Sequence, residues 1–272
     1  MKITLTSWSF PRCTLAEAAG IARALGFAAM DVGAYPGGHL DRDAILRGDR
    51  AEVQRVHALG LQISNVYYTF GAGFVERPLN SPDPDVRRRN LEDFRRVIEF
   101  CATIACPSVM LLPGVIHPGM SKADAIQRCI EASQELLAIS QQAGIEIALE
   151  PHVMGLLESP RDTLAVLEGA PGLKLALDYA HFITLGYTQA DVDPLCAFAA
   201  HVHLRQAKPG FLQTRLEHGT LNFPAMLDAL RQANYAGYLA VEYVHQDYMQ
   251  TDNVDVISET VKMRDLVRAS LG

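Results

Sequence analysis

The sequence has few of the features that mark secreted, membrane or nucleic-acid-binding proteins. Its five cysteines are an odd number without a CxxC pair, so we interpret them as reduced core residues of a cytoplasmic protein. No stretch approaches the roughly 18 consecutive apolar residues of a membrane span. The first residues, MKITLTSWSF, lack the apolar run and cleavage site of a signal peptide. We therefore expect a soluble protein without membrane partners.

Positive charge is also scarce. The chain has 24 Lys and Arg against 31 Asp and Glu, a net charge of −7, which argues against a nucleic-acid partner because such partners require a basic surface. The main basic run is 87–89 together with Arg95 and Arg96. Helical ion-pair spacing of four residues links this run to acids in the pairs Arg88–Glu92, Arg89–Asp93 and Arg95–Glu99. We interpret the run as a solvated, self-paired helix face.

The 272 residues alternate between short apolar runs and helical patterns. Hydrophobic residues make up 49% of the chain and charged residues 20%, an ordinary globular composition. Strands are predicted near 3–9, 27–33, 61–67, 108–113, 145–150, 173–178, 201–205 and 238–243. Eight strand–helix units in a chain of this length predict one domain, 1–272, folded as a single (β/α)8 TIM barrel, which is an α/β fold of typically about 250 residues.

A doubly wound open sheet is the alternative fold. That fold more often carries a glycine-rich phosphate loop after its first strand, and SWSFPRC at 7–13 contains no such loop. Helix signals fit either fold. Thr14 with Glu17 forms a capping box, and Ser121 with Asp124 opens a helix that Gly144 closes. Because no low-complexity linker divides the chain, the barrel remains the prediction.

Four polar residues end four similar apolar runs in the second half of the chain. They are Glu150, Asp178, His203 and Glu242. Successive side chains on a strand point to opposite faces, so the leucines and isoleucines of each run face one side and the four polar tips face the other. Inside a barrel these tips would be adjacent. Three carboxylates and an imidazole gathered together, with no paired cation evident, are costly unless a positive ion lies between them.

The chemistry of this set indicates a metal. Adjacent strands lie about 4.8 Å apart, so four consecutive strand ends can surround one ion. The donors are mostly oxygen with one imidazole and no thiolate. Such a set suits Mn²⁺ first, or Mg²⁺, with Co²⁺, Fe²⁺ or Zn²⁺ as further choices. The rival interpretation is four unrelated polar residues facing water, which the matching parity disfavours.

The same positions resemble a known family. The motifs are LEPH at 149–152, DYAH at 178–181, HVHL at 201–204 and the segment 219–242. They resemble the xylose isomerase-like TIM barrels, a superfamily of sugar phosphate isomerases and epimerases that also includes inosose dehydratases and endonuclease IV-type repair enzymes. The resemblance implies that Glu150, Asp178, His203 and Glu242 bind one divalent metal. It also implies that Glu150 and Glu242 act as acid/base partners, and that the chain is a dimeric or tetrameric homo-oligomer.

The implied function is a metal-dependent isomerase or epimerase acting on a small keto sugar or related hydroxyketone. A metal on the carbonyl and adjacent hydroxyl stabilises the enediolate that forms when the neighbouring C–H loses its proton, and two carboxylates can move that proton. An inosose dehydratase-type lyase shares this first step and is the closest alternative. A non-catalytic sugar-binding protein is a further one. An endonuclease IV-type nuclease would need extra histidines, for which only His117 is near.

Further residues are candidates for substrate binding. The resemblance gives His181, three residues after Asp178, contacts with substrate oxygens. Arg205 shares the parity of His203 and could hold a hydroxyl or phosphate, although the family usually places an arginine several residues later. His152 follows the run at 145–150 and could line the pocket.

Other strand-end residues are open between two interpretations. Trp8, Asp31, Tyr67 and Tyr68 could contact sugar or simply pack. We interpret His201 as a core histidine one layer below the metal, with exchange of its role with that of a neighbouring histidine as the alternative. The loop after 201–205 contains a possible phosphate site without a diagnostic pattern: Lys208, Gly210, Arg215, His218 and Gly219.

Overall fold

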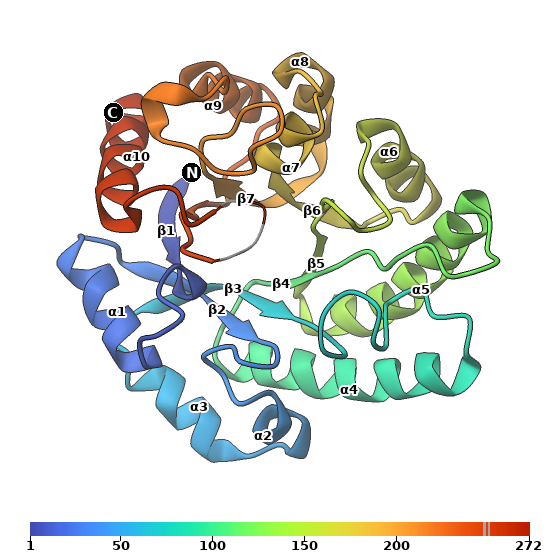
Figure 1. Cartoon of the computed structure of the whole chain (residues 1–272). Coiled ribbons are helices and arrows are strands. Elements are labelled where there is room, and N and C mark those ends of the chain that lie inside the picture. Colours follow the sequence, from blue (N-terminus) through green and yellow to red (C-terminus); the bar gives the residue numbers. More distant parts are fainter. Residues whose placement is uncertain (247–248, 250) are drawn as a thin grey trace.

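The computed structural model describes residues 1–246, 249 and 251–272, and its centre is a closed barrel of eight parallel strands (Figure 1). The strands neighbour one another in chain order, and β8 closes the barrel by pairing with β1. Their bounds are β1 (Lys2–Thr6), β2 (Ala29–Ala34), β3 (Gln62–Tyr68), β4 (Ser108–Leu111), β5 (Glu146–Leu149), β6 (Lys174–Asp178), β7 (Ala199–Leu204) and β8 (Tyr238–Val241). The predicted TIM barrel is confirmed, and the open sheet is excluded.

Helices form the outer ring in Figure 1. They are α1 (Leu15–Ala24), α2 (Arg42–Arg47), α3 (Arg50–His57), α4 (Pro84–Thr103), α5 (Lys122–Ala143), α6 (Pro160–Gly169), α7 (Tyr179–Thr184), α8 (Gln189–Val192), α9 (Phe223–Gln232) and α10 (Val256–Leu271). Short 3₁₀ turns lie at Ser7–Ser9, Asp193–Phe198 and Leu216–His218. No helix in the described part of the chain is long and apolar enough to cross a membrane.

Local sequence signals set several of these boundaries. Thr14 and Glu17 form the predicted capping box of α1, in which each side chain accepts from the other residue's backbone N–H. Ser121 accepts from the backbone N–H of Asp124 at the start of α5, and Gly144 ends that helix in the left-handed region at φ 67°. The first strand is shorter than predicted. It stops at Thr6, and a 3₁₀ turn follows that contains Trp8.

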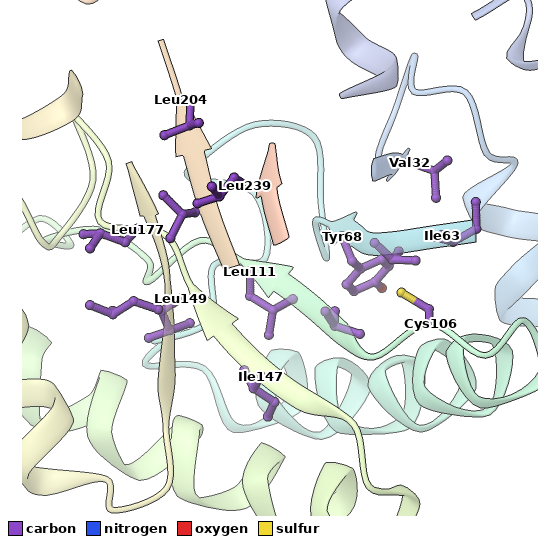
Figure 2. Close-up of a cluster of buried hydrophobic side chains, with 14 of the residues drawn as sticks. Val32, Ile63, Tyr68, Cys106, Leu111, Ile147, Leu149, Leu177, Leu204 and Leu239 are labelled. Atoms are coloured by element: carbon purple, nitrogen blue, oxygen red, sulfur yellow. The ribbon is translucent and has the colours of Figure 1, made fainter. Parts of the chain in front are cut away.

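The barrel has two apolar layers because its strands alternate. Outward side chains of the strands pack against the helices and form the large core seen in Figure 2, which includes Leu149, Leu177, Leu204 and Leu239. The inward layer is small and separate: Trp8, Met110, Ala148, Ala176 and Val244. This division confirms the parity predicted from the sequence. Short alanines on the inward face leave space above them for larger polar groups.

All five cysteines are free, as expected, and only Cys13 among them is not buried.

The basic run does form ion pairs along α4, but the partners predicted four residues away are wrong. Arg88 pairs with Asp85 at 2.9 Å and Arg96 with Glu99 at 2.9 Å, both at three-residue spacing. Helix residues three apart are equally close neighbours, so spacing alone did not choose between the partners.

A buried asparagine ties together two loops at the carboxyl end of the barrel. Asn80 is fully buried, and its Nδ2 donates to the carbonyl oxygen of Val115 at 2.7 Å. Its Oδ1 accepts from the backbone N–H of Val115 at 3.1 Å. These two hydrogen bonds connect the loop after β3 to the loop after β4.

We predict that Asn80→Ala lowers the free energy of unfolding by about 1–3 kcal/mol, because it leaves both backbone groups of Val115 without their partner. Urea denaturation followed by circular dichroism measures this change. The control is Gln127→Ala, which removes an exposed side-chain contact on α5 and should change stability by less than about 0.5 kcal/mol. Equal stability of the two variants would contradict the proposed tie.

Candidate active site

The four polar strand tips meet at the carboxyl end of the barrel. Glu150 directly follows β5, Asp178 ends β6, His203 lies in β7, and Glu242 directly follows β8. Asp178 and His203 are register partners on neighbouring strands. All four side chains are buried, and each offers a donor atom within 4.8 Å of the others. The tertiary structure therefore brings together the residues that the alternation pattern singled out.

The two glutamates approach the same ring nitrogen of His203. Its Nδ1 is 2.8 Å from Oε1 of Glu150 and 3.2 Å from Oε2 of Glu242. The other oxygen of Glu242, Oε1, accepts a hydrogen bond from Nε1 of Trp8 at 2.6 Å. Glu242 thus has one oxygen fixed by the indole. Its Oε2 is buried and makes no hydrogen bond to any residue that the structure describes.

These residues fit a divalent metal ion. Three carboxylates and one imidazole form a compact, buried donor set without a thiolate, which is the ligand chemistry of Mn²⁺, Mg²⁺ and similar ions. The buried Oε2 of Glu242 adds a second sign, because it makes no hydrogen bond in the described structure and has only the longer ionic contacts with His203 and Arg205. We regard Glu150, Asp178, His203 and Glu242 as the candidate metal centre.

A cation does accompany the acids, so the expectation that they have no paired cation is wrong. Arg205 is 5% exposed, and one of its terminal nitrogens lies 2.5 Å from Oδ2 of Asp178 and 3.6 Å from Oε2 of Glu242. The sequence placed Arg205 on the correct face but gave no sign that its side chain folds back onto the acids. The arginine offsets part of the negative charge, so the site is less acidic than a count of its carboxylates suggests.

Burial and charge shift the pKa values of this cluster in opposite directions. Burial alone lowers the pKa of His203, but Glu242, Asp31 and Glu150 together raise it well above its usual value. Burial raises the pKa of Asp178 to about 6, against the opposing effect of Arg205. For Glu242, burial is outweighed by Arg205 and His203, which hold its pKa well below the ordinary range. The surrounding acids therefore favour the protonated form of His203.

A second polar layer lies beneath the first. Oδ2 of Asp31 is 2.6 Å from Nε2 of His201 and 3.7 Å from Nε2 of His203. The hydroxyl of Ser64 donates to the other oxygen of Asp31 at 2.5 Å. His201 is fully buried here, one layer below His203. Asp31 faces the nitrogen of His203 opposite to the one that faces the glutamates, so it can fix the orientation of that ring.

A cavity of about 310 Å³ opens above the cluster. Glu150 and Glu242 line its floor, and Trp8, His181 and Arg205 also line it. A cavity of about 440 Å³ lies beside α5 and contains His117, which belongs to none of the metal-capable groups in the described residues. The cavity above the acids is therefore where a substrate would meet the candidate metal centre.

The predicted substrate-binding histidines lie together in this cavity. The rings of His152 and His181 are in contact, with centroids 3.9 Å apart and planes tilted by 40°. Asp178 caps the short helix α7 by accepting from the backbone N–H of Ala180, and this turn brings His181 to within 3.5 Å of Asp178. Arg205 approaches Nε2 of His181 at 3.0 Å. In the motif DYAH, Asp178 thus ends β6 and caps α7, and His181 lines the cavity three residues later.

The remaining strand-end candidates divide by position. Trp8 and Tyr67 line the cavity, whereas Asp31 lies below it and Tyr68 packs outward against Phe70. Sequence reasoning missed Tyr35 and Phe74, which also line the cavity. Both belong to long loops that follow strands, and that position was their only signal in the sequence.

The fold and site define a TIM barrel with a buried acid–imidazole cluster at its carboxyl end. The family model described as "Xylose isomerase-like TIM barrel" matches residues 19–265. The chain belongs to this family. This family assignment agrees with the resemblance carried by the strand-end motifs.

Several proteins similar to this chain are named as sugar epimerases. An L-ribulose-5-phosphate 3-epimerase, UlaE, of Shigella sonnei (strain Ss046) is 24% identical over 211 residues, which cover 71% of this chain and 68% of the relative. The crystal structure of D-psicose 3-epimerase with D-tagatose from Clostridium cellulolyticum H10 matches with a TM-score of 0.77 and 14% identity, covering 100% of this chain and 99% of the other. The IOLI protein with a bound zinc atom matches with a TM-score of 0.75 and 15% identity, covering 98% and 97%. These structural likenesses support the fold.

We predict that Asp31→Asn weakens binding of Mn²⁺ by about 10–100-fold, because a neutral amide holds the His203 ring less firmly than a carboxylate. Isothermal titration calorimetry measures the affinity, and circular dichroism checks the fold. Ser64→Ala is the matched control. It removes one hydrogen bond to Asp31 but keeps the carboxylate, and should weaken binding less. Unchanged affinity in Asp31→Asn would show that Asp31 does not support the centre.

Metal binding should also strengthen as pH rises from about 6 to 8, with release of protons, because a metal ligand must be deprotonated. The raised pKa of His203 means that its proton must leave when a metal binds, and low pH favours the proton. Titrations of Mn²⁺ in two buffers with different ionisation enthalpies measure the number of protons released. An affinity independent of pH, with no proton release, would contradict this assignment of ligands.

Proposed function

We propose that the chain is a divalent-metal-dependent epimerase or isomerase of a small keto sugar or related hydroxyketone. The observation that carries the proposal is the placement of two buried glutamates, Glu150 and Glu242, beside the same ring nitrogen of His203 and in the lining of one cavity. Family membership and the sugar 3-epimerases among the relatives support it. Epimerisation requires two groups that can exchange a proton with one carbon, and these glutamates supply them.

The proposed division of labour follows from the contacts of each residue. Glu150, Asp178, His203 and Glu242 would hold the metal, which when bound polarises the substrate carbonyl and acidifies the neighbouring C–H. Glu150 and Glu242 would remove and return the proton. The indole N–H of Trp8 keeps one Glu242 oxygen fixed and leaves Oε2 to act. His152, His181 and Arg205 line the cavity and would orient substrate oxygens.

Two alternative functions, a lyase and a nuclease, differ in the residues and products that they require. An inosose dehydratase-type lyase would use the same proton removal and then lose water, so its product differs although its first step does not. An endonuclease IV-type nuclease requires additional metal-binding histidines from the third and fourth strands, and neither β3 nor β4 contains a histidine. In the described residues, His117 lies in the cavity beside α5 and joins no metal-capable group. The nuclease is therefore not supported.

Deuterium exchange tests the reaction class. We expect the Mn²⁺-loaded chain, incubated in D₂O with a panel of ketopentoses and ketohexoses, to incorporate one deuterium at a carbon next to the carbonyl, and to yield the epimer or the isomeric aldose. Proton NMR follows both signals. Exchange accompanied by a diketone chromophore would favour the lyase. Absence of exchange with every ketose would refute the proposed function.

Replacing either glutamate by its amide tests the acid/base roles. We expect Glu150→Gln and Glu242→Gln to lower kcat by about 10²–10⁴-fold, because an amide neither accepts nor returns the proton. Glu158→Gln is the matched control. This glutamate accepts from the backbone N–H of Met154 outside the cavity, and its amide variant should keep at least half of the wild-type rate. Wild-type activity in either active-site variant would overturn the assignment.

A further inference from the structure

We propose that the cavity accepts an uncharged keto sugar and rejects the phosphate ester of the same sugar. This inference rests on the proposed function and names its substrate class. It also separates the chain from its relatives that are named for a ribulose phosphate.

Beyond the reacting centre, the wall of the cavity is mostly aromatic and aliphatic. Its larger apolar members are Trp8, Tyr35, Tyr67, Phe74, Met110, Leu212 and Val244. Tyr67 packs against Trp8 at 5.7 Å and against Tyr35 at 5.0 Å between ring centroids, so these rings form one continuous surface. Such a surface suits the C–H groups of a sugar. A phosphate dianion placed against it would lose its hydration without gaining a partner.

Arg205 is the only lysine or arginine among the described residues that line the cavity. Its guanidinium is bound to Asp178 at 2.5 Å and lies 3.6 Å from Glu242. It also donates to Nε2 of His181, a contact that requires the neutral form of that imidazole. Arg205 therefore balances the acids of the floor. It lies at the reacting end of the cavity, where a distal phosphate of a substrate held by Glu150 and Glu242 would not reach.

The basic residues that suggested a phosphate site lie elsewhere. Lys208 is placed over the ring of Phe211, 4.5 Å from its centroid. Arg215 and His218 are exposed, and none of the three lines the cavity. The residues that the structure does not describe are Asp247, Tyr248 and Gln250, and none of them has a positively charged side chain. Among the described residues that line the cavity, none besides Arg205 is a lysine or arginine that could form the charge-assisted hydrogen bonds that bind phosphate.

The cavity size agrees with a monosaccharide. About 310 Å³ is at the lower end of the roughly 300–1,000 Å³ of small-molecule sites. A free ketose can fill this space with its hydroxyls near the polar floor and its carbon chain along the aromatic wall. A bulky charged ester would have to occupy the apolar part.

Matched pairs of sugars test the inference. The pairs are D-ribulose with D-ribulose 5-phosphate and D-fructose with D-fructose 6-phosphate, each titrated into the full-length, Mn²⁺-loaded chain and followed by the shift in melting temperature and by calorimetry. We expect at least one free ketose to bind at least ten-fold more tightly than its ester. Tighter or equal binding of the esters in both pairs would overturn the inference, as would absence of binding by all four compounds.

The binding experiment tests the substrate class, whereas the deuterium-exchange experiment tests the reaction, so the two proposals can be refuted independently. If free ketoses bind preferentially but no deuterium is exchanged, the proposed reaction is wrong and the selectivity stands. If esters bind preferentially and exchange, the reaction stands and the selectivity is wrong.

Two variants locate the selectivity in the cavity wall. Ala72 is exposed and lines the mouth of the cavity, so Ala72→Arg adds a guanidinium there without burying it. We expect this variant to bind the esters at least ten-fold more tightly relative to the free sugars. Arg215→Ala is the control and should leave both affinities within two-fold. Selective loss of ester binding in Arg215→Ala would place a phosphate site in the loop after β7 and overturn the inference.

Discussion

The balance of charge around His203 is the constraint on which the rest of the site depends. Glu150, Asp178 and Glu242 are buried with it at the carboxyl end of the barrel, and each buried carboxylate costs several kcal/mol unless it has a partner. Arg205, which directly follows β7, lies against two of these acids, and the acids favour a proton on the His203 imidazole. A bound metal would replace the proton on His203 and leave Arg205 to offset the third acid.

The barrel makes this concentration of charge possible because it separates two kinds of packing. The outward faces of the strands pack their leucines against the helices and supply most of the apolar burial. The inward face can then carry small residues, such as Ala148 and Ala176, beneath the polar layer. Below the candidate metal ligands, Asp31 holds His201 and faces His203, so the imidazole is supported from the barrel interior. The apolar residues that stabilise the fold and the polar residues of the candidate site therefore lie on opposite faces of the same strands.

The cavity above the acids combines a charged floor with an aromatic wall. The floor can act on a carbonyl and its neighbouring carbon, whereas Trp8, Tyr35 and Tyr67 offer a surface without cations. A local feature of the chain positions a histidine between the floor and the wall. Asp178 caps α7, and that single turn presents His181 beside Arg205 and against His152. Two loops joined through Asn80 lie at the same end of the barrel.

The alternation of apolar and polar residues by itself determined which polar residues end the last four strands and that they share the inward face. It could do so because side-chain direction along a strand follows from backbone geometry. These residues are the candidate metal ligands. Capping residues likewise determined the starts of α1 and α5. Tertiary structure decided what alternation does not encode. Arg205 turns back onto Asp178, Asp31 lies beneath the cavity, the loop residues Tyr35 and Phe74 form its wall, and the basic loop residues stay outside it. These outcomes depend on long flexible side chains and on loop paths, which are set by contacts between residues far apart in the chain.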